Sequence, residues 1–495
     1  MVAILDTQER QSELLQIRQD KLRALTESGR SPYLRTRCDV THLASDITGN
    51  FEALEGSKVS LAGRQMSKRD MGRAFFCDLQ DMSGRVQLYV KTDDLGQEAF
   101  DEFKRWDIGD IIAVSGTVFR TKRGEISVHA HGVELLSKSL RPLPEKYHGL
   151  TDTETRYRRR YVDLIVNPEI KEVFVKRSKT IAAIRAFLDG EGFLEVETPV
   201  LHTLDTGAAA RPFRTHLNAL DMQMHLRIEL ELFLKRLIVG GIDRVYELGR
   251  IFRNEGMSVR HNPEFTMCEL YRAYTDYYGM MDIIERLFAH VAERVTGSRA
   301  VTYQGGTADL TPPWPRLTMT QAVKDIAGVD YNDWQTDADA REALAARGLP
   351  CRADMTRGEC LYAVFEEKCE HTLRGPVFIT EYPVEVSPLA KRCARDPLFT
   401  ERFEFFINGW EMGNAFTELN DPADQRARFA RQLEIRKAEG VAASMDEDFL
   451  CAMEYGMPPA GGLGFGVDRL VMLLTDSPSI RDVLLFPTMR PEAGQ

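Results

Sequence analysis

The most constraining feature of this sequence is the stretch from Val245 to Tyr278, VYELGRIFRNEGMSVRHNPEFTMCELYRAYTDYY. Its two ends, 245–252 and 265–274, are rich in β-formers, whereas turn-forming residues gather between them. This pattern predicts an antiparallel hairpin with a long tip loop. Because side chains alternate across a strand, many of the charged ones would share one face. Such a face is a poor wall for a hydrophobic core. The hairpin is therefore either the floor of a site for a charged ligand or a salt-bridged surface hairpin.

Length and composition allow two or three domains around this hairpin. Of the 495 residues, 43% are hydrophobic and 28% are charged, as is ordinary for a soluble globular protein. The net charge of −11 argues against an indiscriminate nucleic-acid binder but allows a local basic surface. The sequence shows neither an apolar run of membrane-spanning length nor a signal peptide, so we expect a cytoplasmic protein. The eight cysteines contain no Cys-x-x-Cys pair, which predicts reduced thiols rather than a zinc site.

Residues 57–136 carry a series of short β-rich runs separated by glycines, with a helical segment at 95–106. This pattern suits a small barrel of about five strands, of the OB type. Such barrels often hold single-stranded nucleic acid by stacking bases on aromatic side chains and tracking phosphates with Lys and Arg. The alternative is that about half of the aromatic residues simply fill the barrel, because small barrels need interior side chains.

The remaining chain mixes helical and β-rich segments. Apolar spacing predicts helices over 8–28 and 168–189, the second leading into a strand at 193–197. Strands are expected to dominate 211–278 and 376–469. We therefore expect an α+β chain with four parts: a helical extension at 1–56, the barrel at 57–140, a basic, solvent-exposed linker at 141–165, and a second domain at 166–495 with a helical insertion at about 311–375.

Three motifs in this chain resemble the signatures of the class II aminoacyl-tRNA synthetases. The first is Phe193–Pro199, reading FLEVETP; the second combines FRNEG at Phe252–Gly256 with RHNPEFT at Arg260–Thr266; the third is GGLGFGVDRL at Gly461–Leu470. They occur in the family's order and span more than half of the chain. The resemblance implies an antiparallel catalytic sheet flanked by helices, with the barrel as an anticodon-binding domain.

The resemblance also implies a two-step reaction, in which a carboxylate attacks the α-phosphate of ATP and a tRNA ribose hydroxyl then takes the aminoacyl group. Because the sequence has no Walker-type motif, ATP would be held by arginines and Mg²⁺. Arg253 would fork onto the α-phosphate and the substrate carboxylate, and Arg469 would contact the γ-phosphate. A turn at 408–409 would bring Glu404 and Glu411 together as metal ligands. The ATP-binding residues implied are Arg253, Glu255, His261, Phe265, Glu404, Glu411, Gly466 and Arg469, of which Arg253 and Arg469 are catalytic.

Charge indicates which amino acid the site would take. If Glu231, Glu269 and Glu418 meet near Tyr271, they repel an acidic substrate and pair with an amino acid that carries two cations. This finer pattern resembles the lysyl-tRNA synthetases. The resemblance assigns Gly207 and Glu231 to the α-amino group of lysine, Asn414 to its carboxylate, Phe416 to its aliphatic stem, and Glu269, Tyr271 and Glu418 to its ε-ammonium.

The partners implied by the resemblance are ATP, L-lysine and tRNA(Lys), with Mg²⁺ bound alongside ATP and no membrane partner. The helix and strand at 168–197 would lie at a two-fold interface, which predicts a homodimer. In the barrel, Phe76 and Gln87 are the expected anticodon contacts.

Three positions depart from the family's usual pattern. Glu229 stands where a small residue is usual, Thr206 where glycine is usual, and Trp410 where arginine is common. If the segment around Glu229 is extended, this side chain shares a face with Glu231 and could raise a carboxylate pKa. Two other functions stay open: an aspartyl- or asparaginyl-type synthetase, and an inactive synthetase-like nucleic-acid-binding protein. A ligase that modifies a protein is disfavoured, because such enzymes are expected to lack the barrel.

Overall fold

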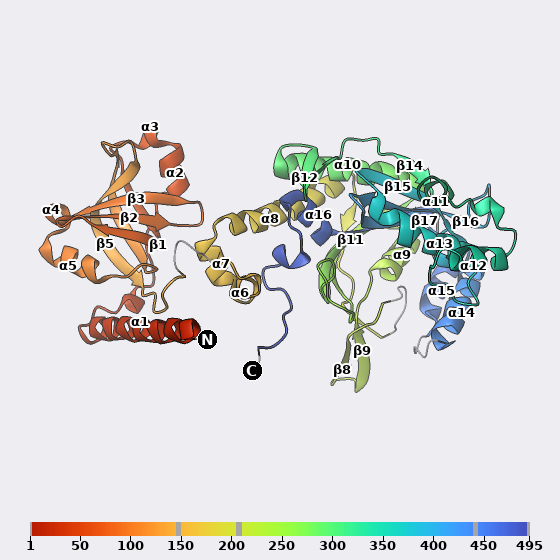
Figure 1. Ribbon diagram of the computed structural model, residues 1–495, viewed down its shortest axis with the longest axis horizontal. Coiled ribbons are helices and arrows are strands. Elements are labelled where there is room, and N and C mark those ends of the chain that lie inside the picture. Colours follow the sequence, from red (N-terminus) through yellow and green to blue (C-terminus); the bar gives the residue numbers. More distant parts are fainter. Residues whose placement is uncertain (1, 145–149, 204–209, 439–443, 493–495) are drawn as a thin grey trace. The chain divides into compact units, whose positions relative to one another are not determined.

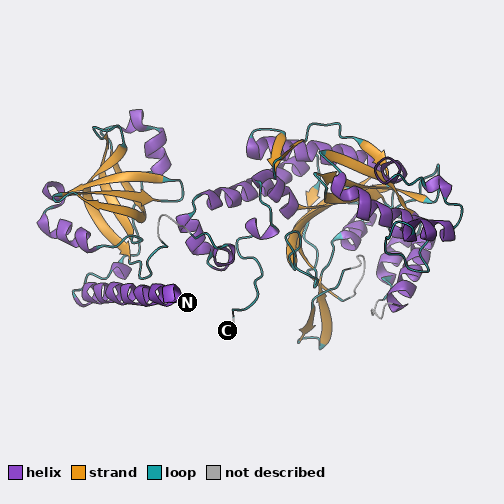
Figure 2. Cartoon of the chain, in the orientation of Figure 1, coloured by secondary structure: helices purple, strands orange, loops and turns teal. Residues whose placement is uncertain are grey.

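The computed structural model describes residues 2–144, 150–203, 210–438 and 444–492. It shows an α+β chain that divides into two compact units, residues 1–168 and 169–495 (Figures 1 and 2). Within the described residues, no helix is both long enough and apolar enough to cross a lipid bilayer.

The first unit is built on a closed five-stranded barrel, in the order β1-β2-β3-β5-β4. Inward-facing side chains such as Leu61, Phe75, Leu88 and Val114 fill the barrel and are at most 3% exposed. The predicted OB-type barrel is thus confirmed, including the helix between its third and fourth strands. The elements of this unit are α1 (Val2–Glu27), α2 (Ala44–Gly49), α3 (Phe51–Leu54), β1 (Lys58–Asp70), β2 (Ala74–Gln80), β3 (Arg85–Lys91), α4 (Thr92–Leu95), α5 (Gln97–Arg105), β4 (Ile111–Arg120), β5 (Ile126–Ser137), α6 (Thr153–Arg158) and α7 (Arg160–Val166).

The basic segment before residue 165 differs from expectation. We expected its arginines to lie in solvent, but Arg160 is only 1% exposed and its Nη1 donates to Asp163 Oδ2 at 2.6 Å. The carboxylate one turn later on α7 neutralises the guanidinium, which a pattern of basic residues alone does not reveal.

The second unit is organised around an eight-stranded, mostly antiparallel sheet in the order β14-β15-β16-β17-β18-β11-β10-β6 (Figure 1). Helices α8, α10 and α16 share a large apolar core with β16 and β18, which confirms a catalytic-type sheet flanked by helices. The elements are β6 (Leu194–Glu195), β10 (Arg244–Phe252), β11 (Glu264–Ala273), β14 (Arg316–Thr318), β15 (Pro376–Pro383), β16 (Phe399–Ile407), β17 (Trp410–Thr417), β18 (Ala460–Gly466), α8 (Glu169–Gly190), α10 (Tyr277–Thr296) and α16 (Val467–Thr475).

Two hairpins of this sheet carry the residues of interest. The predicted hairpin is confirmed: β10 and β11 pair from Arg244↔Arg272 to Phe252↔Glu264, leaving residues 253–263 as the tip loop. In the second hairpin, β16 and β17 are joined by Asn408 and Gly409, whose φ angles of 52° and 75° are those of a tight two-residue turn.

The segment between β14 and β15 is helical, as predicted, and has its own apolar core. Its helices are α11 (Met319–Ala327), α12 (Asp337–Ala345) and α13 (Arg357–Val364), the last continuing into a π-helical turn at Phe365–Cys369. Two small sheets lie outside the main one: β7 (Leu201–His202), β9 (Met222–Leu226) and β8 (Arg214–Leu217) form one, and β12 (Ala300–Tyr303) with β13 (Gly306–Asp309) the other.

Strand residues outnumber helical ones in 211–278 and 376–469, as predicted, but three helices that were not predicted also lie there: α9 (Glu231–Val239), α14 (Pro422–Ala438) and α15 (Glu447–Glu454). In α9 the apolar residues Leu234 and Ile238 recur at helical spacing and are buried against Phe449 of α15. Glycines 240 and 241 then end the helix.

Candidate functional site

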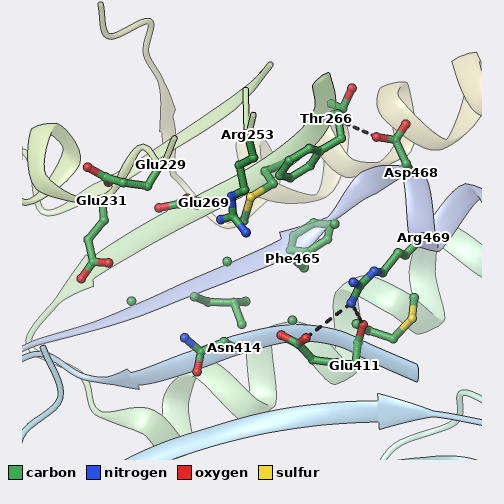
Figure 3. Close-up of a pocket in the computed structure, with 18 of the residues that line it drawn as sticks. Glu229, Glu231, Arg253, Thr266, Glu269, Glu411, Asn414, Phe465, Asp468 and Arg469 are labelled. Atoms are coloured by element: carbon green, nitrogen blue, oxygen red, sulfur yellow. Dashed lines mark hydrogen bonds and ion pairs between the residues drawn. The ribbon is translucent and has the colours of Figure 1, made fainter. Parts of the chain in front are cut away.

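A cavity of about 480 Å³ lies among β11, β17, β18 and the tip loop of the β10–β11 hairpin. Figure 3 shows Glu229, Glu231 and Glu269 gathered at one end. Arg469 lies at the other end beside Glu411 and Asp468, with Arg253 between the two ends. Of the residues predicted to bind ligand, the cavity is lined by Glu231, Arg253, Glu255, His261, Phe265, Glu269, Tyr271, Glu411, Asn414, Phe416, Gly466 and Arg469. The structure therefore brings residues from the second and third sequence motifs and from both hairpins into one place, whereas no residue of the first motif lines the cavity.

Arg253 follows directly after β10 and faces the middle of the cavity. Its Nε and Nη2 both lie 3.4 Å from the carbonyl oxygen of Ile228, and its Cζ lies 5.3 Å from the ring centre of Phe265. The carbonyl and the ring fix the plane of the guanidinium. The stacking of Phe265 on an adenine ring stays a prediction.

Arg469 marks the cationic end. It is the third residue of α16, and its Nη1 donates to the carbonyl oxygen of Glu411 and lies 3.5 Å from Oε2 of that residue (Figure 3). Asp468 beside it accepts from the backbone N–H of Thr266 at 2.7 Å, which ties α16 to β11. The helix N-terminus and Arg469 together favour an anion here.

The tip loop of the β10–β11 hairpin borders the same end. His261 Nδ1 lies 2.9 Å from Ser258 Oγ, and the pKa of His261 is lowered by burial and by the neighbouring Arg469 and Arg260. Glu255 accepts a 3.3 Å hydrogen bond from the backbone N–H of Arg211. At neutral pH this rim thus carries a largely neutral imidazole among guanidinium groups.

Glu269 and Tyr271 stand on β11 at the acidic end. The Tyr271 hydroxyl donates to Glu269 Oε2 at 3.2 Å, and the backbone N–H of Leu230 donates to Oε1 at 3.3 Å. Burial, followed by the charge of Glu231, raises the pKa of Glu269 to about 7. This carboxyl is therefore poised to ionise when a cation arrives.

Behind this end lies a lysine of the chain itself. Lys235 on α9 is fully buried; its Nζ lies 2.5 Å from Glu231 Oε1 and also forms an ion pair with Glu418, which is 0% exposed. Glu418, expected to read a substrate ammonium directly, is thus already paired with Lys235 and does not line the cavity. Burial nevertheless raises the pKa of Glu418 to about 8, against the opposing effect of Lys235.

Glu229 lines the cavity together with Glu231 and Glu269 (Figure 3). The sequence left open an extended segment around Glu229, but the segment is not extended. Glu229 precedes α9, and Glu231 is the first residue of that helix. Glu229 Oε2 accepts from the backbone N–H of Leu232 at 3.2 Å, so the side chain caps the helix. Burial first, and then the charges of Glu269 and Glu231, raise the pKa of Glu229 well above its ordinary value.

Glu404 and Glu411, the predicted metal ligands, lie on one face of the β16–β17 hairpin. A bulge between Phe405 and Phe406 skips Met412, so that Glu411 and Asn414 both line the cavity although they are three residues apart. Glu404 does not line the cavity: Arg402 Nη2 donates to its Oε1 at 2.6 Å and the Tyr382 hydroxyl to its Oε2 at 2.9 Å.

These donors fit a hard cation shared with substrate phosphates, because Mg²⁺ is usually held by one or two carboxylates together with phosphate oxygens and waters. Glu411 offers a partly exposed carboxylate to the cavity. Burial raises the pKa of Glu404 to about 7, and the nearby charge of Glu411 adds to this against the opposing effect of Arg402. The described residues contain no group of three or more His, Cys, Asp or Glu side chains that could hold a metal ion by themselves.

The glycines of β18 leave room for the acidic end. A Cβ on Gly462 would collide with the Tyr271 ring and with Glu418, and one on Gly464 would come within 3.3 Å of Glu269 Cγ. The glycine-rich motif thus allows β18 to pass close to the acids of β11 and β17.

In the barrel, Phe76 and Gln87 lie on the neighbouring strands β2 and β3. The rings of Phe76 and Tyr89 lie 4.9 Å apart, and Gln87 Oε1 accepts from Ser127 Oγ at 3.0 Å. Both predicted contacts are partly exposed. Gly207 and Thr206 fall outside the described residues.

Sequence reasoning missed two residues that organise the site. In the sequence Lys235 is a single charge within an apolar run, and its burial depends on Glu418, far along the chain. Arg402 donates to both Glu404 and, at 2.9 Å, Asn414 Oδ1. Its position two residues before Glu404, on the same face of a strand, was a signal that could have found it.

Comparison with known proteins agrees with this geometry. Residues 152–490 match the family described as tRNA synthetases class II (D, K and N), and residues 59–136 match the OB-fold nucleic acid binding domain. A protein named lysine--tRNA ligase from Thermoanaerobacter pseudethanolicus is 58% identical over 490 residues, covering 99% of this chain and 98% of the relative. Proteins of the same name from Moorella thermoacetica (58% identical; 98% of this chain, 99% of the relative) and Clostridium perfringens (52%; 99% of each) are also similar.

Proposed function

Because the chain belongs to the class II tRNA synthetases (D, K and N), we propose that it ligates L-lysine to tRNA(Lys). The reaction uses ATP, passes through a lysyl-adenylate, and releases pyrophosphate and AMP. The relatives named lysine--tRNA ligase, which match almost the whole chain, support this choice of substrate.

The observation that carries the proposal is the concentration of acid at one end of the cavity. Glu229, Glu231 and Glu269 line that end, and Glu418 lies behind it with Lys235 as the buried cation. An aspartate substrate would bring a further carboxylate into this group without a cation to receive it. Lysine instead supplies two ammonium groups, and its stem can lie along Phe416. A desolvated ammonium with full hydrogen bonding discriminates strongly against analogues that lack it.

Activation of the amino acid requires an aligned carboxylate and a stabilised phosphate. Arg253 lies between the two ends of the cavity, so its fork can hold the lysine carboxylate against the α-phosphate. Arg469 and the N-terminus of α16 stabilise the distal phosphates. Glu411, with Glu404 behind it, would hold Mg²⁺, which supplies neutralisation of charge on the phosphates when bound.

The barrel is proposed to bind the anticodon. Phe76 offers a face on which a base can stack, and Gln87 offers hydrogen bonds to a base edge. We also propose that the chain acts as a homodimer, which sedimentation can test directly.

The decisive experiment is ATP–pyrophosphate exchange with purified protein and Mg²⁺, using lysine, aspartate and asparagine in turn. We expect exchange with lysine alone, followed by charging of tRNA(Lys) with labelled lysine. Faster exchange with aspartate or asparagine would show a related synthetase of different specificity. Absence of exchange with all three would show an inactive synthetase-like protein.

A further inference from the structure

The loop that joins β10 to β11 presents a cation to the phosphate end of the cavity. Arg260 lies in this loop beside His261, and both line the cavity. The loop backbone is tied down: the Ser258 N–H donates to the His261 carbonyl at 3.0 Å, and the Ile480 N–H donates to the Val259 carbonyl at 2.9 Å. These bonds fix the loop's path but do not fix the long, exposed Arg260 side chain.

The Arg260 side chain is placed by an aromatic ring from the other hairpin. Its Cζ lies 4.6 Å from the ring centre of Trp410, which is the distance of a cation–π contact. Trp410 is held in turn by Tyr303, whose ring meets the indole edge-on with centres 5.4 Å apart. The tight turn at 408–409 and the Ile407↔Trp410 pair fix the backbone beneath it.

Trp410 does not line the cavity, although the next residue, Glu411, does. Any influence on a bound nucleotide must therefore pass through the side chains that Trp410 touches. Arg260 and Arg469 both line this cavity. Two guanidinium groups repel each other, so holding Arg260 in place has a cost that the indole face offsets.

We propose that Trp410 is a positioning residue that stacks on Arg260 and holds its guanidinium over the phosphate end of the cavity for ATP. The proposal rests on the function proposed above, since it assumes that this end receives the nucleotide. It gives a role to one of the three positions at which the sequence departs from its family's usual pattern.

The test is a double-mutant cycle in ATP–pyrophosphate exchange, with KM measured separately for ATP and lysine. Trp410→Leu removes the aromatic ring but keeps an apolar side chain. Trp410→Phe keeps an aromatic ring that attracts a cation more weakly than indole. We expect the Leu variant to raise KM for ATP about two- to fivefold without changing KM for lysine, and Phe to fall between. Arg260→Gln should raise KM for ATP, and adding Trp410→Leu to it should have no further effect.

The control is Trp334→Phe, a buried tryptophan of the helical insertion, which should leave both KM values unchanged. Independent, multiplicative effects of the two substitutions, or an equal rise in both KM values, would overturn the proposal. If the Leu variant does not fold, the cycle is run with Trp410→Phe and the same criteria apply. The wild-type protein separates the two hypotheses: without lysine-dependent exchange the proposed function itself fails, and calorimetric ATP affinity then replaces KM in the cycle.

Discussion

At one end of the cavity the acidic side chains are mostly buried, and at the other the arginines are partly exposed and lie among further acids. Glu269 and Glu229 are each 6% exposed, whereas Arg260 and His261 lie open to solvent. Buried carboxylates without a full set of counter-ions hold their protons more tightly, so the acidic end waits for a cation. Exposed guanidinium groups are always charged and can attract an anion from a distance. The contrast teaches that selection of the amino acid depends on burial, and capture of the nucleotide on charge.

The largest expected effect comes from removing the buried cation of the acidic end. Lys235→Met leaves Glu231 and Glu418 without their shared partner, and breaking a buried ion pair costs about 3–5 kcal/mol. Urea unfolding measures this loss. The control Lys324→Met removes an exposed lysine that pairs with Asp330, and it should change stability little. Equal losses in the two variants would mean that Lys235 is not the electrostatic centre of this end.

At the boundary between the two ends, Arg253→Ala should lower the rate of adenylate formation about 10²–10³-fold, the usual cost of losing one preorganised charge-stabilising donor. Single-turnover kinetics with lysine and ATP measure the rate. Arg250→Ala, which changes an exposed arginine on β10, is the matched control and should leave the rate unchanged. A rise in KM for lysine with an unchanged rate of adenylate formation would assign Arg253 to ground-state binding only.

Glu269→Gln should affect only the acidic end. Loss of a charged hydrogen-bond acceptor corresponds to a rise in KM for lysine of about 10- to 150-fold, with KM for ATP unchanged. Because the pKa of Glu269 is about 7, lysine affinity of the wild-type protein should rise with pH through that value, as the carboxyl loses its proton. The Gln variant should lose this dependence. Glu264→Gln, on the same strand outside the cavity, should retain it.

The smallest expected effect is the pH dependence of stability that comes from Glu229. A single titrating carboxyl changes the free energy of unfolding by at most about 1.4 kcal/mol for each pH unit. The pKa of Glu229 in the folded chain lies above its value in the unfolded chain. Between these two pKa values the unfolded chain binds fewer protons than the folded chain, so stability falls as pH rises. Glu229→Gln cannot titrate but can still accept the Leu232 N–H. The melting temperature of this variant should therefore rise relative to that of the wild type as the pH is raised from 5 to 8. A constant difference would show that Glu229 acts only as a helix cap, a role that Glu229→Ala isolates.

The sequence was informative where local pattern decides the structure. The β10–β11 hairpin lies within one residue of its predicted bounds, because turn residues and β-formers act over short distances. The barrel was predicted correctly for the same reason. Lys235 could not be predicted, since its burial requires Glu418 from a distant strand. The helix α9 was also missed, because a short apolar run does not distinguish strand from helix.

The bulge at Met412 makes the register of β17 as important as the identity of its residues. If Met412 paired regularly with Phe406, Glu411 would move to the next position along the strand and turn toward the opposite side of the sheet, away from the cavity. Substitutions at Met412 that keep the bulge leave Glu411 in place. Recombination between related sequences can therefore exchange side chains here, but a change that straightens the strand would silence the site while leaving the fold intact.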